Sequence, residues 1–301
     1  MFAQYFGQFL LNSGLVTPYE LDNAISAQKE TRVKLGVLAI NHGYMTAEQV
    51  EEVHQAQSRM DKKFGEIAVD LGYVDDASVS KLLDSQQSAH LALGQALIDQ
   101  GIMNYEAFAD ALNRYKKDYS LSDEQFESIV NGSIETLVEA VLLKGGLSQE
   151  RELTDYISLF AKNMIRFIDS DILMEIASPA DIEGSDWIVQ QTLMNGNRTV
   201  GRVTAIGGSE ASLLRLASIY AQETIDEPGE MMEASVGEFL NLHNGIYLVN
   251  LSNEGVELEL DPQSVIRGSD FSPSSPVKTV IHITGTELSF ALVLTNLSDL
   301  T

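Results

Sequence analysis

Two residues with clear chemical potential, Glu238 and Asn241, stand three positions apart in the segment GEMMEASVGEFLNLHNGIYLVN. The segment has the periodicity of an amphipathic helix, and side chains three apart share one face of a helix. Its predicted buried stripe consists of Met232, Val236, Phe239, His243 and Ile246. The carboxylate and the carboxamide project away from that stripe, because successive side chains turn by about 100°. We therefore expect both groups to be available to a partner molecule.

Small residues surround this pair. Ala234, Gly237 and Gly245 carry side chains too small to block the close approach of another protein. Glycine inside a helix costs roughly 1 kcal/mol relative to alanine, and a close backbone contact would account for two glycines here. The spacing alone is not specific, because Glu20-x-x-Asn23 repeats it in a segment of different character. Only the surrounding sequence can show which of the two Glu-x-x-Asn pairs belongs to a functional site.

The composition is that of a soluble globular protein, with 301 residues, 44% hydrophobic and 21% charged, which is enough for two domains. No signal region and no apolar run long enough to cross a bilayer is present, so we expect a cytoplasmic protein without membrane insertion. The absence of cysteine excludes disulfides and thiolate chemistry. The five histidines lack ligand spacing, which predicts no dedicated metal site. A net charge of −25 disfavours nucleic acid as a partner, because phosphate backbones are repelled.

An internal repeat occupies roughly residues 1–117 as four copies. Two sets of glycines define it, with 29 residues between copies and seven between the sets. The first set is Gly7, Gly36, Gly65 and Gly94, and the second is Gly14, Gly43, Gly72 and Gly101. Three residues after the second glycine come the N-cap residues Thr17, Thr46, Asp75 and Asn104. Each copy therefore predicts a helix that ends at a glycine, a tight turn and a second helix.

These copies resemble the N-terminal domain of secretion and pilus ATPases of the GspE and MshE type, whose motif opens with Arg-Leu-Gly and closes with glutamine. The closing glutamines here are Gln28, Gln57 and Gln86, and the leading positions hold Tyr5, Lys34, Lys63 and Ala92. Paired motifs of that family can bind cyclic di-GMP, so the resemblance implies phosphate contacts by Lys34 and Lys63. Lysine lacks the planar fork of the family's arginine, however. We favour the alternative, in which the glycines serve helix packing alone.

Beyond the repeats, residues 120–146 predict one or two short helices that begin at the cap Ser122 and form a connector. The sequence LTDYISLFAKNMIRFI then predicts an amphipathic helix. Alternating segments that predict strands are WIVQQTLM, NRTVGRVTAI, VELEL, VKTVIHI and LSFALVL. Asn195-Gly196-Asn197 predicts a hairpin turn between the first two strands.

We accordingly expect an α+β protein of three parts. An all-α repeat module of four 29-residue helix-turn-helix units would span 1–117, a helical connector 118–148 and an α+β domain 149–301.

The order of elements after residue 150, with GEFLN followed by VELELDPQSVIRG, resembles the CheX, CheC and FliY family of chemotaxis phosphatases. The single Glu-x-x-Asn of this domain resembles CheX most, because CheC-like members carry two. The resemblance implies a phosphatase that acts on the aspartyl phosphate of a CheY-like response regulator in two-component signalling. It also implies that the partner's receiver domain supplies Mg2+ and that the protein forms a homodimer.

By the same resemblance, Asn241 orients the attacking water and Glu238 pairs with the active-site lysine of the receiver. One alternative is that both are ordinary solvated residues of a degenerate domain kept for dimerisation or docking. A second is a non-catalytic signalling adaptor that binds cyclic di-GMP or a protein partner through the repeats. His243 and Trp187 are expected to pack in the core rather than to join the site.

Overall fold

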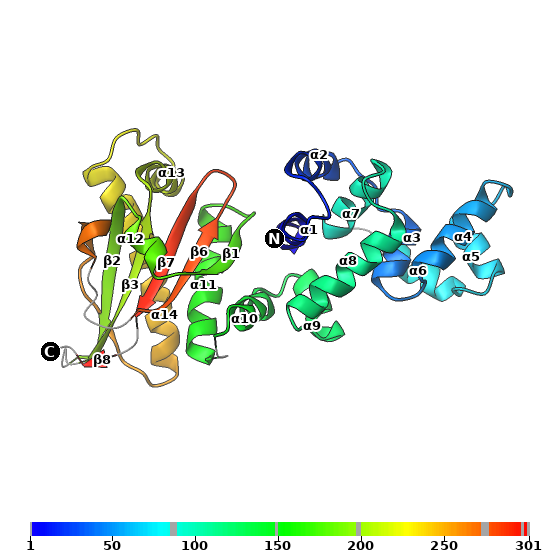
Figure 1. The fold of residues 1–301 in the computed structure, drawn as a ribbon. Coiled ribbons are helices and arrows are strands. Elements are labelled where there is room, and N and C mark those ends of the chain that lie inside the picture. Colours follow the sequence, from blue (N-terminus) through cyan, green and yellow to red (C-terminus); the bar gives the residue numbers. More distant parts are fainter. Residues whose placement is uncertain are drawn as a thin grey trace. The chain divides into compact units, whose positions relative to one another are not determined.

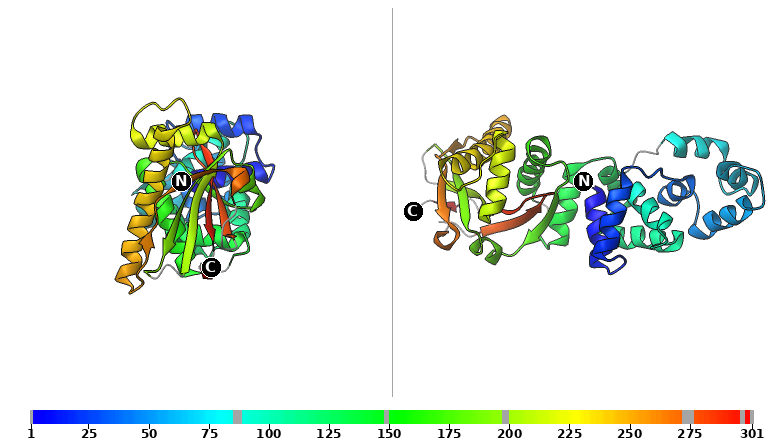
Figure 2. Two further views of the ribbon diagram at one scale, coloured as in Figure 1. Left: turned by 90° about the vertical axis from the view of Figure 1, so that its left-hand side faces the viewer. Right: turned by 90° about the horizontal axis from the view of Figure 1, so that it is seen from above.

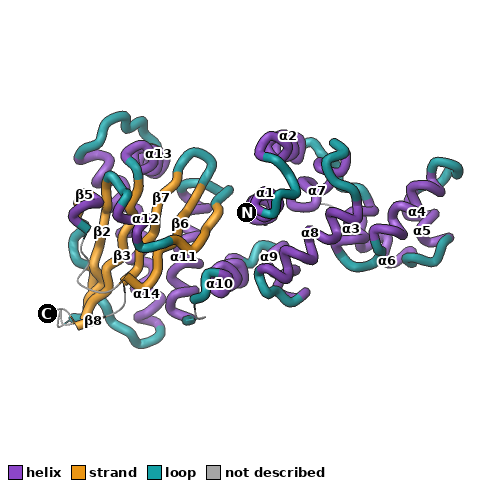
Figure 3. Tube along the Cα trace, viewed as in Figure 1, coloured by secondary structure: helices purple, strands orange, loops and turns teal. Residues whose placement is uncertain are grey.

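The computed structural model describes residues 2–84, 89–147, 150–196, 200–271, 277–295 and 298–299. The chain divides into two compact units, Met1–Ser133 and Ile134–Thr301. Within the described residues the first unit consists of helices, whereas the second combines helices with an antiparallel sheet (Figure 1; Figure 3). The protein is therefore α+β, as predicted. The finer division at 117 and 148 stays a prediction.

The N-terminal unit is built from helix pairs. Its helices are α1 (Phe2–Asn12), α2 (Pro18–Gln28), α3 (Leu35–Asn41), α4 (Ala47–Gln57), α5 (Phe64–Asp70), α6 (Asp76–Asp84), α7 (Ala89–Asp99), α8 (Tyr105–Asp118) and α9 (Asp123–Val130). The first helix of each of the four leading pairs is followed by a glycine with φ between 66° and 75°, a conformation that favours glycine. The second helices are capped by the side chains of Thr17, Thr46, Asp75 and Asn104. The predicted helix-turn-helix copies are thus confirmed, although Gln86 lies outside the described residues.

The first glycine of each copy lets the two helices of that copy approach closely. A Cβ added at Gly36 would lie 2.7 Å from a methyl carbon of Val50, and one at Gly94 would lie 2.3 Å from the ring of Phe108. Normal contacts between carbon atoms are about 3.5–4.0 Å. These glycines therefore have the packing role that we expected for them.

The C-terminal unit combines helices with one antiparallel sheet. Its helices are α10 (Ile134–Lys144), α11 (Arg151–Phe167), α12 (Ala180–Glu183), α13 (Glu210–Ala221), α14 (Glu230–Asn253) and the 3-10 helix η1 (Gly268–Asp270). Its strands are β1 (Leu173–Ala177), β2 (Trp187–Met194), β3 (Val200–Gly208), β4 (Glu259–Leu260), β5 (Ser264–Arg267), β6 (Val277–Thr284), β7 (Ser289–Thr295) and β8 (Ser298–Asp299). The strand order is β1-β6-β7-β3-β2-β4, while β5 also pairs with β2 and β8 with β3. The sequence did not predict β1, β5 and β8, and of the predicted strand VELEL only Glu259–Leu260 forms a strand, β4.

Strands β2 and β3 form the hairpin that was predicted, with Trp187 opposite Gly208 and Met194 opposite Gly201. Part of the expected turn, Asn197, lies outside the described residues. Trp187 is half-buried beneath the guanidinium of Arg267, 3.5 Å from the ring centre. This tryptophan therefore packs at the strand end, as expected.

Helices α11, α13 and α14 pack on one face of the sheet (Figure 2). Aromatic contacts tie this layer together, because the ring of Phe160 on α11 lies 5.6 Å from that of Phe239 on α14 and 6.2 Å from that of Phe290 on β7. The opposite face carries a smaller apolar cluster that includes Ile182 of α12 and Ile188 of β2. Successive residues of a strand thus alternate between the layer of α11, α13 and α14 and the opposite face with this second cluster.

Helix α14 buries a wider arc than the sequence predicted. The members of the predicted stripe that are buried are Met232, Val236, Phe239 and His243. Ile246 is 38% exposed, so its predicted burial was wrong. Leu240, Asn244 and Tyr247 are buried instead, which places the centre of the arc closer to Asn241. Ile246 lies at the opposite edge of that arc and reaches solvent.

Candidate functional site

The two residues singled out by the sequence lie on the outer side of α14. Glu238 is exposed and Asn241 is half-buried. The helix is held by the buried ring of Phe239, which contacts Phe160 of α11 and Tyr220 of α13. Because the buried arc is fixed by these contacts, the turn that carries Glu238 and Asn241 has one orientation.

Asn241 is anchored to the sheet by a buried glutamine. Nε2 of Gln191 on β2 donates a hydrogen bond of 2.8 Å to Oδ1 of Asn241. Gln191 is only 2% exposed and also donates to the backbone oxygen of Asp261, at 2.9 Å. The amide of Asn241 is consequently restrained at its carbonyl end while its side chain reaches the surface.

Sequence reasoning missed Gln191. A signal was present, because Gln191 lies between Val189 and Leu193 at an inward position of an alternating strand. A buried polar side chain at such a position needs hydrogen-bond partners, and the helix that covers the strand is the place to find them. Only the packing of α14 on β2 shows which residues those partners are.

Glu238 makes no hydrogen bond or ion pair with the residues that the structure describes. Its charge is felt by Tyr220 on α13, whose pKa is raised first by burial and then by the negative charge of Glu238. An exposed carboxylate that pairs with no cation among the described residues is suited to pair with a cation on another molecule.

Of the small residues expected to leave room for a partner, Gly245 does so and Gly237 does not. A Cβ added at Gly245 would meet nothing within 4 Å. Gly237 is buried, and the side chain of Gln263 covers it and donates to its backbone oxygen at 3.2 Å. The space beside Glu238 on the side of Gly237 is therefore occupied by the loop between β4 and β5.

Exposed apolar side chains continue the same face of α14 in both directions. Met231, two turns before Glu238, is 54% exposed, and Val249, three turns after it, is 62% exposed. Residues at these spacings share a helix face. The outer face therefore has polar groups at its centre and apolar side chains toward its ends, a combination typical of interaction surfaces.

His243 is not part of the site. It is fully buried, its Nδ1 lies 3.2 Å from Nδ2 of Asn163, and the ring of Tyr156 lies 4.4 Å away. Burial lowers its pKa to about 3, so the ring is neutral at physiological pH. The expectation of a hydrogen-bonded core histidine is confirmed.

The two lysines proposed from the repeats lie in the N-terminal unit, each at the N-cap of a helix. Lys34 precedes α3, and its ammonium pairs with Asp99 at 2.7 Å. Lys63 precedes α5, and its backbone N–H donates to Glu66 at 2.9 Å. A phosphate would have to compete with Asp99 for Lys34.

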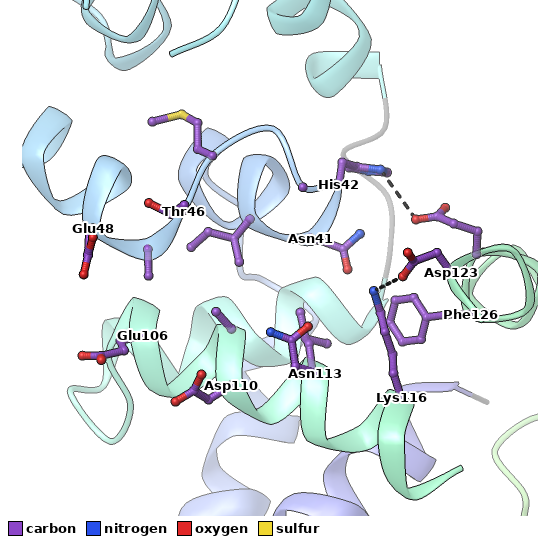
Figure 4. Close-up of a pocket in the computed structure, with 17 residues that line it drawn as sticks. Asn41, His42, Thr46, Glu48, Glu106, Asp110, Asn113, Lys116, Asp123 and Phe126 are labelled. Atoms are coloured by element: carbon purple, nitrogen blue, oxygen red, sulfur yellow. Dashed lines mark hydrogen bonds and ion pairs between the residues drawn. The ribbon is translucent and has the colours of Figure 1, made fainter. Parts of the chain in front are cut away.

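A cavity of about 750 Å³ lies in the N-terminal unit between α3, α4, α8 and α9 (Figure 4). Its acidic lining residues are Glu48, Glu106, Asp110, Asp123 and Glu127, and its basic ones are His42 and Lys116. Lys116 already pairs with Asp123 at 2.8 Å. Lys34 and Lys63 do not line the cavity. An acidic lining repels the phosphates of a cyclic dinucleotide.

The described residues lack two other kinds of feature. No group of three or more His, Cys, Asp and Glu side chains is placed to hold a metal ion. Within the same residues, no helix combines the length and apolarity needed to span a membrane.

The sequence matches no family model and no curated protein. Several solved structures are similar to about half of this chain. A CheC-like superfamily protein from Shewanella sp. PV-4 shares 13% identity over 49% of this chain and 98% of its own, with a TM-score of 0.40. The chemotaxis protein CheX from Vibrio vulnificus shares 13% identity over 48% of this chain and 99% of its own, with a TM-score of 0.39. A complex of CheX, CheY, BeF3 and Mg2+ from Borrelia burgdorferi shares 15% identity over 49% of this chain and 97% of the matched chain, with a TM-score of 0.40.

Proposed function

We propose that the C-terminal unit is a phosphatase that hydrolyses the aspartyl phosphate of a CheY-like response regulator. The observation that carries this proposal is that a restrained carboxamide and an exposed carboxylate lie one turn apart on the outer side of the same helix. Asn241 is held at Oδ1 by Gln191, while Glu238 lies one turn away without a partner among the described residues. Such a pair supplies positioning rather than acid-base or covalent chemistry.

The reaction needs little from the phosphatase. The partner contributes the acyl phosphate, the Mg2+ that binds it and the active-site lysine. A water oxygen attacks phosphorus, the bond between phosphorus and the aspartyl oxygen breaks, and its electron pair returns to the carboxylate. One water proton leaves with the inorganic phosphate or passes to solvent. Asn241 holds that water in line, which is the main requirement for hydrolysis of a phosphoryl group that is already activated.

Glu238 has a docking role in this proposal. Its exposed carboxylate pairs with the receiver lysine and so fixes the position of Asn241 over the phosphorus atom. The apolar side chains of Met231 and Val249 contact the partner on either side, and the open space at Gly245 admits its backbone. The net charge of −25 also favours a partner site that presents lysine and magnesium.

The test is dephosphorylation of a phosphorylated receiver from the same genome in the presence of Mg2+. We expect wild type to accelerate phosphate release above spontaneous decay and Asn241→Ala to abolish the acceleration. Asn23→Ala is the matched control, because Asn23 follows Glu20 with the same spacing in the N-terminal unit. No acceleration by wild type, or equal rates for wild type and Asn241→Ala, would refute the phosphatase.

The competing function is a non-catalytic signalling adaptor that acts through the N-terminal unit. The acidic cavity favours a protein partner with basic side chains over a cyclic dinucleotide. Under this alternative, receiver dephosphorylation is absent and a truncation after residue 133 retains partner binding. We also propose a homodimer, and light scattering that gives the mass of a monomer would overturn it.

A further inference from the structure

We infer that Gln191 is the positioning residue of the proposed site, because it fixes which end of the Asn241 amide faces the partner. The role of Gln191 in catalysis rests on the proposed phosphatase function. Its effect on the orientation of Asn241 rests on the hydrogen bonds of the free protein alone.

Gln191 belongs to a chain of hydrogen bonds that starts in the core. The hydroxyl of Tyr156 on α11 donates to Oδ1 of Asn244 at 2.8 Å. Nδ2 of Asn244 then donates to Oε1 of Gln191 at 2.9 Å and to Oγ1 of Thr204 on β3 at 3.0 Å. Tyr156 and Asn244 are 0% exposed, as is Thr204. The chain therefore links four elements, α11, α14, β2 and β3, without access to water.

Two contacts indicate the same direction for this chain. The hydroxyl of Thr204 donates to the backbone oxygen of Gln191 at 3.3 Å, so its Oγ1 accepts from Asn244. Nδ2 of Asn244 must then lie on that side, and the end of Gln191 that faces it must be the oxygen. At the other end, the backbone oxygen of Asp261 can only accept, so the group of Gln191 beside it must be the nitrogen.

The orientation of Gln191 in turn determines that of Asn241. Both protons on Nε2 of Gln191 are directed to acceptors, one on Asp261 and one on Asn241. Asn241 must therefore present Oδ1 inward, which turns Nδ2 toward the outer face. The partner meets an N–H donor that can hold the oxygen of a water molecule, and the second lone pair of Oδ1 stays free. An exposed asparagine without this anchor would sample both amide orientations.

A purely structural reading is that the chain only satisfies buried polar groups. It predicts that replacing Gln191 changes stability and leaves turnover per folded molecule unchanged. The positioning role predicts instead a loss of kcat with little change in KM, because the docking of Glu238 is untouched.

The first experiment measures receiver dephosphorylation by Gln191→Leu and Gln191→Glu, with folding checked by circular dichroism. We expect both to lower kcat about 10-fold or more at pH 8, with KM within about twofold of wild type. In Gln191→Glu, burial raises the pKa of the new carboxyl, whose protonated form regains one donor. The activity of Gln191→Glu relative to wild type should therefore rise as the pH falls, whereas that of Gln191→Leu should not.

Gln190→Leu is the matched control, because Gln190 is the adjacent glutamine on β2, faces the opposite side of the sheet and bonds to Ser264. Its kcat is expected to equal that of wild type. An active wild type with unchanged kcat in both Gln191 variants would overturn the positioning role and leave the phosphatase intact.

The second experiment needs no partner. Hydrogen exchange of side-chain amides in the free wild-type protein, followed by NMR, should show slow exchange at Nε2 of Gln191 and fast exchange at Nδ2 of Asn241. The reverse order would overturn the inferred orientation. An inactive wild type with the expected exchange order would refute the phosphatase and the catalytic role, while the orientation of Asn241 would stand.

Discussion

Asn241 and Asn244 lie almost one turn apart on α14, and the side chain of Gln191 bonds to both, at 2.8 Å and 2.9 Å. Their surroundings differ sharply, because Asn244 is fully buried and Asn241 reaches the surface. One amide therefore belongs to the core and the other to the outer face. This division predicts that the two substitutions differ in their effect on stability.

Asn244→Ala should destabilise the protein strongly. It leaves Gln191, Thr204 and Tyr156 each short of a buried hydrogen-bond partner, at a cost of about 1–3 kcal/mol for each unsatisfied group that cannot relax. We expect a loss of roughly 3 kcal/mol in the free energy of unfolding, measured by urea denaturation. Asn241→Ala should cost about 1 kcal/mol or less, because water can replace its side chain, yet lower kcat about 100-fold. Equal losses of stability in the two variants would contradict this division.

Glu238→Gln should weaken docking and spare the chemical step. Removing the charge removes the proposed pair with the receiver lysine, so we expect KM to rise about 10-fold and kcat to stay within about threefold. Raising the salt concentration should raise the KM of wild type toward that of the variant, since salt screens an exposed ion pair. Glu230→Gln, an exposed position on the first turn of the same helix, provides the control for net charge. A KM unchanged by Glu238→Gln would contradict the proposed role.

His243 should make the C-terminal unit less stable in mild acid. Its pKa is about 3 in the folded protein because of burial, against 6.5 ordinarily, so between these values the unfolded chain binds a proton that the folded chain does not. Acid therefore favours unfolding by up to about 1.4 kcal/mol per pH unit below 6.5. Denaturation followed by the fluorescence of Trp187, the single tryptophan, measures this slope. In His243→Leu the slope should be smaller, and an identical slope would rule out His243 as its source.

The sequence predicted the parts of the site that depend on local periodicity. The exposure of Glu238 and the burial of His243 follow from the helical wheel, and the caps of the repeats follow from local chemistry. Asn241, which the wheel also places away from the predicted stripe, is half-buried because its side chain bonds to Gln191. Gln191 could not be predicted, because a strand's alternation shows that a residue is buried but not which helix residue it meets. The contact of Gln263 with Gly237 could not be predicted either, because it depends on the path of the loop between β4 and β5, which only the tertiary structure shows.

Gly94→Ala should destabilise the N-terminal unit. The added Cβ would lie 2.3 Å from the ring of Phe108, so α7 and α8 must move apart or the ring must leave its rotamer. Overpacking of this kind typically costs about 1–3 kcal/mol. Thermal unfolding of wild type, Gly94→Ala, Phe108→Ala and the double variant checks the cause. The stability lost through Gly94→Ala should largely vanish in the Phe108→Ala background, where the ring is absent. Additive losses would show that the glycine is needed for another reason.

Cyclic di-GMP is expected to give no binding heat in calorimetry at micromolar protein. The ammonium of Lys34 is held by Asp99, and the cavity of the N-terminal unit carries carboxylates at Glu48, Glu106 and Asp110. A phosphate that binds Lys34 would have to displace Asp99, and one that enters the cavity would approach like charge. Asp99→Asn is the informative variant, because it frees Lys34, and weak binding that appears only in this variant would identify the ion pair as the barrier. Micromolar binding by wild type that is lost in Lys34→Ala or Lys63→Ala would instead establish the nucleotide site and favour the adaptor.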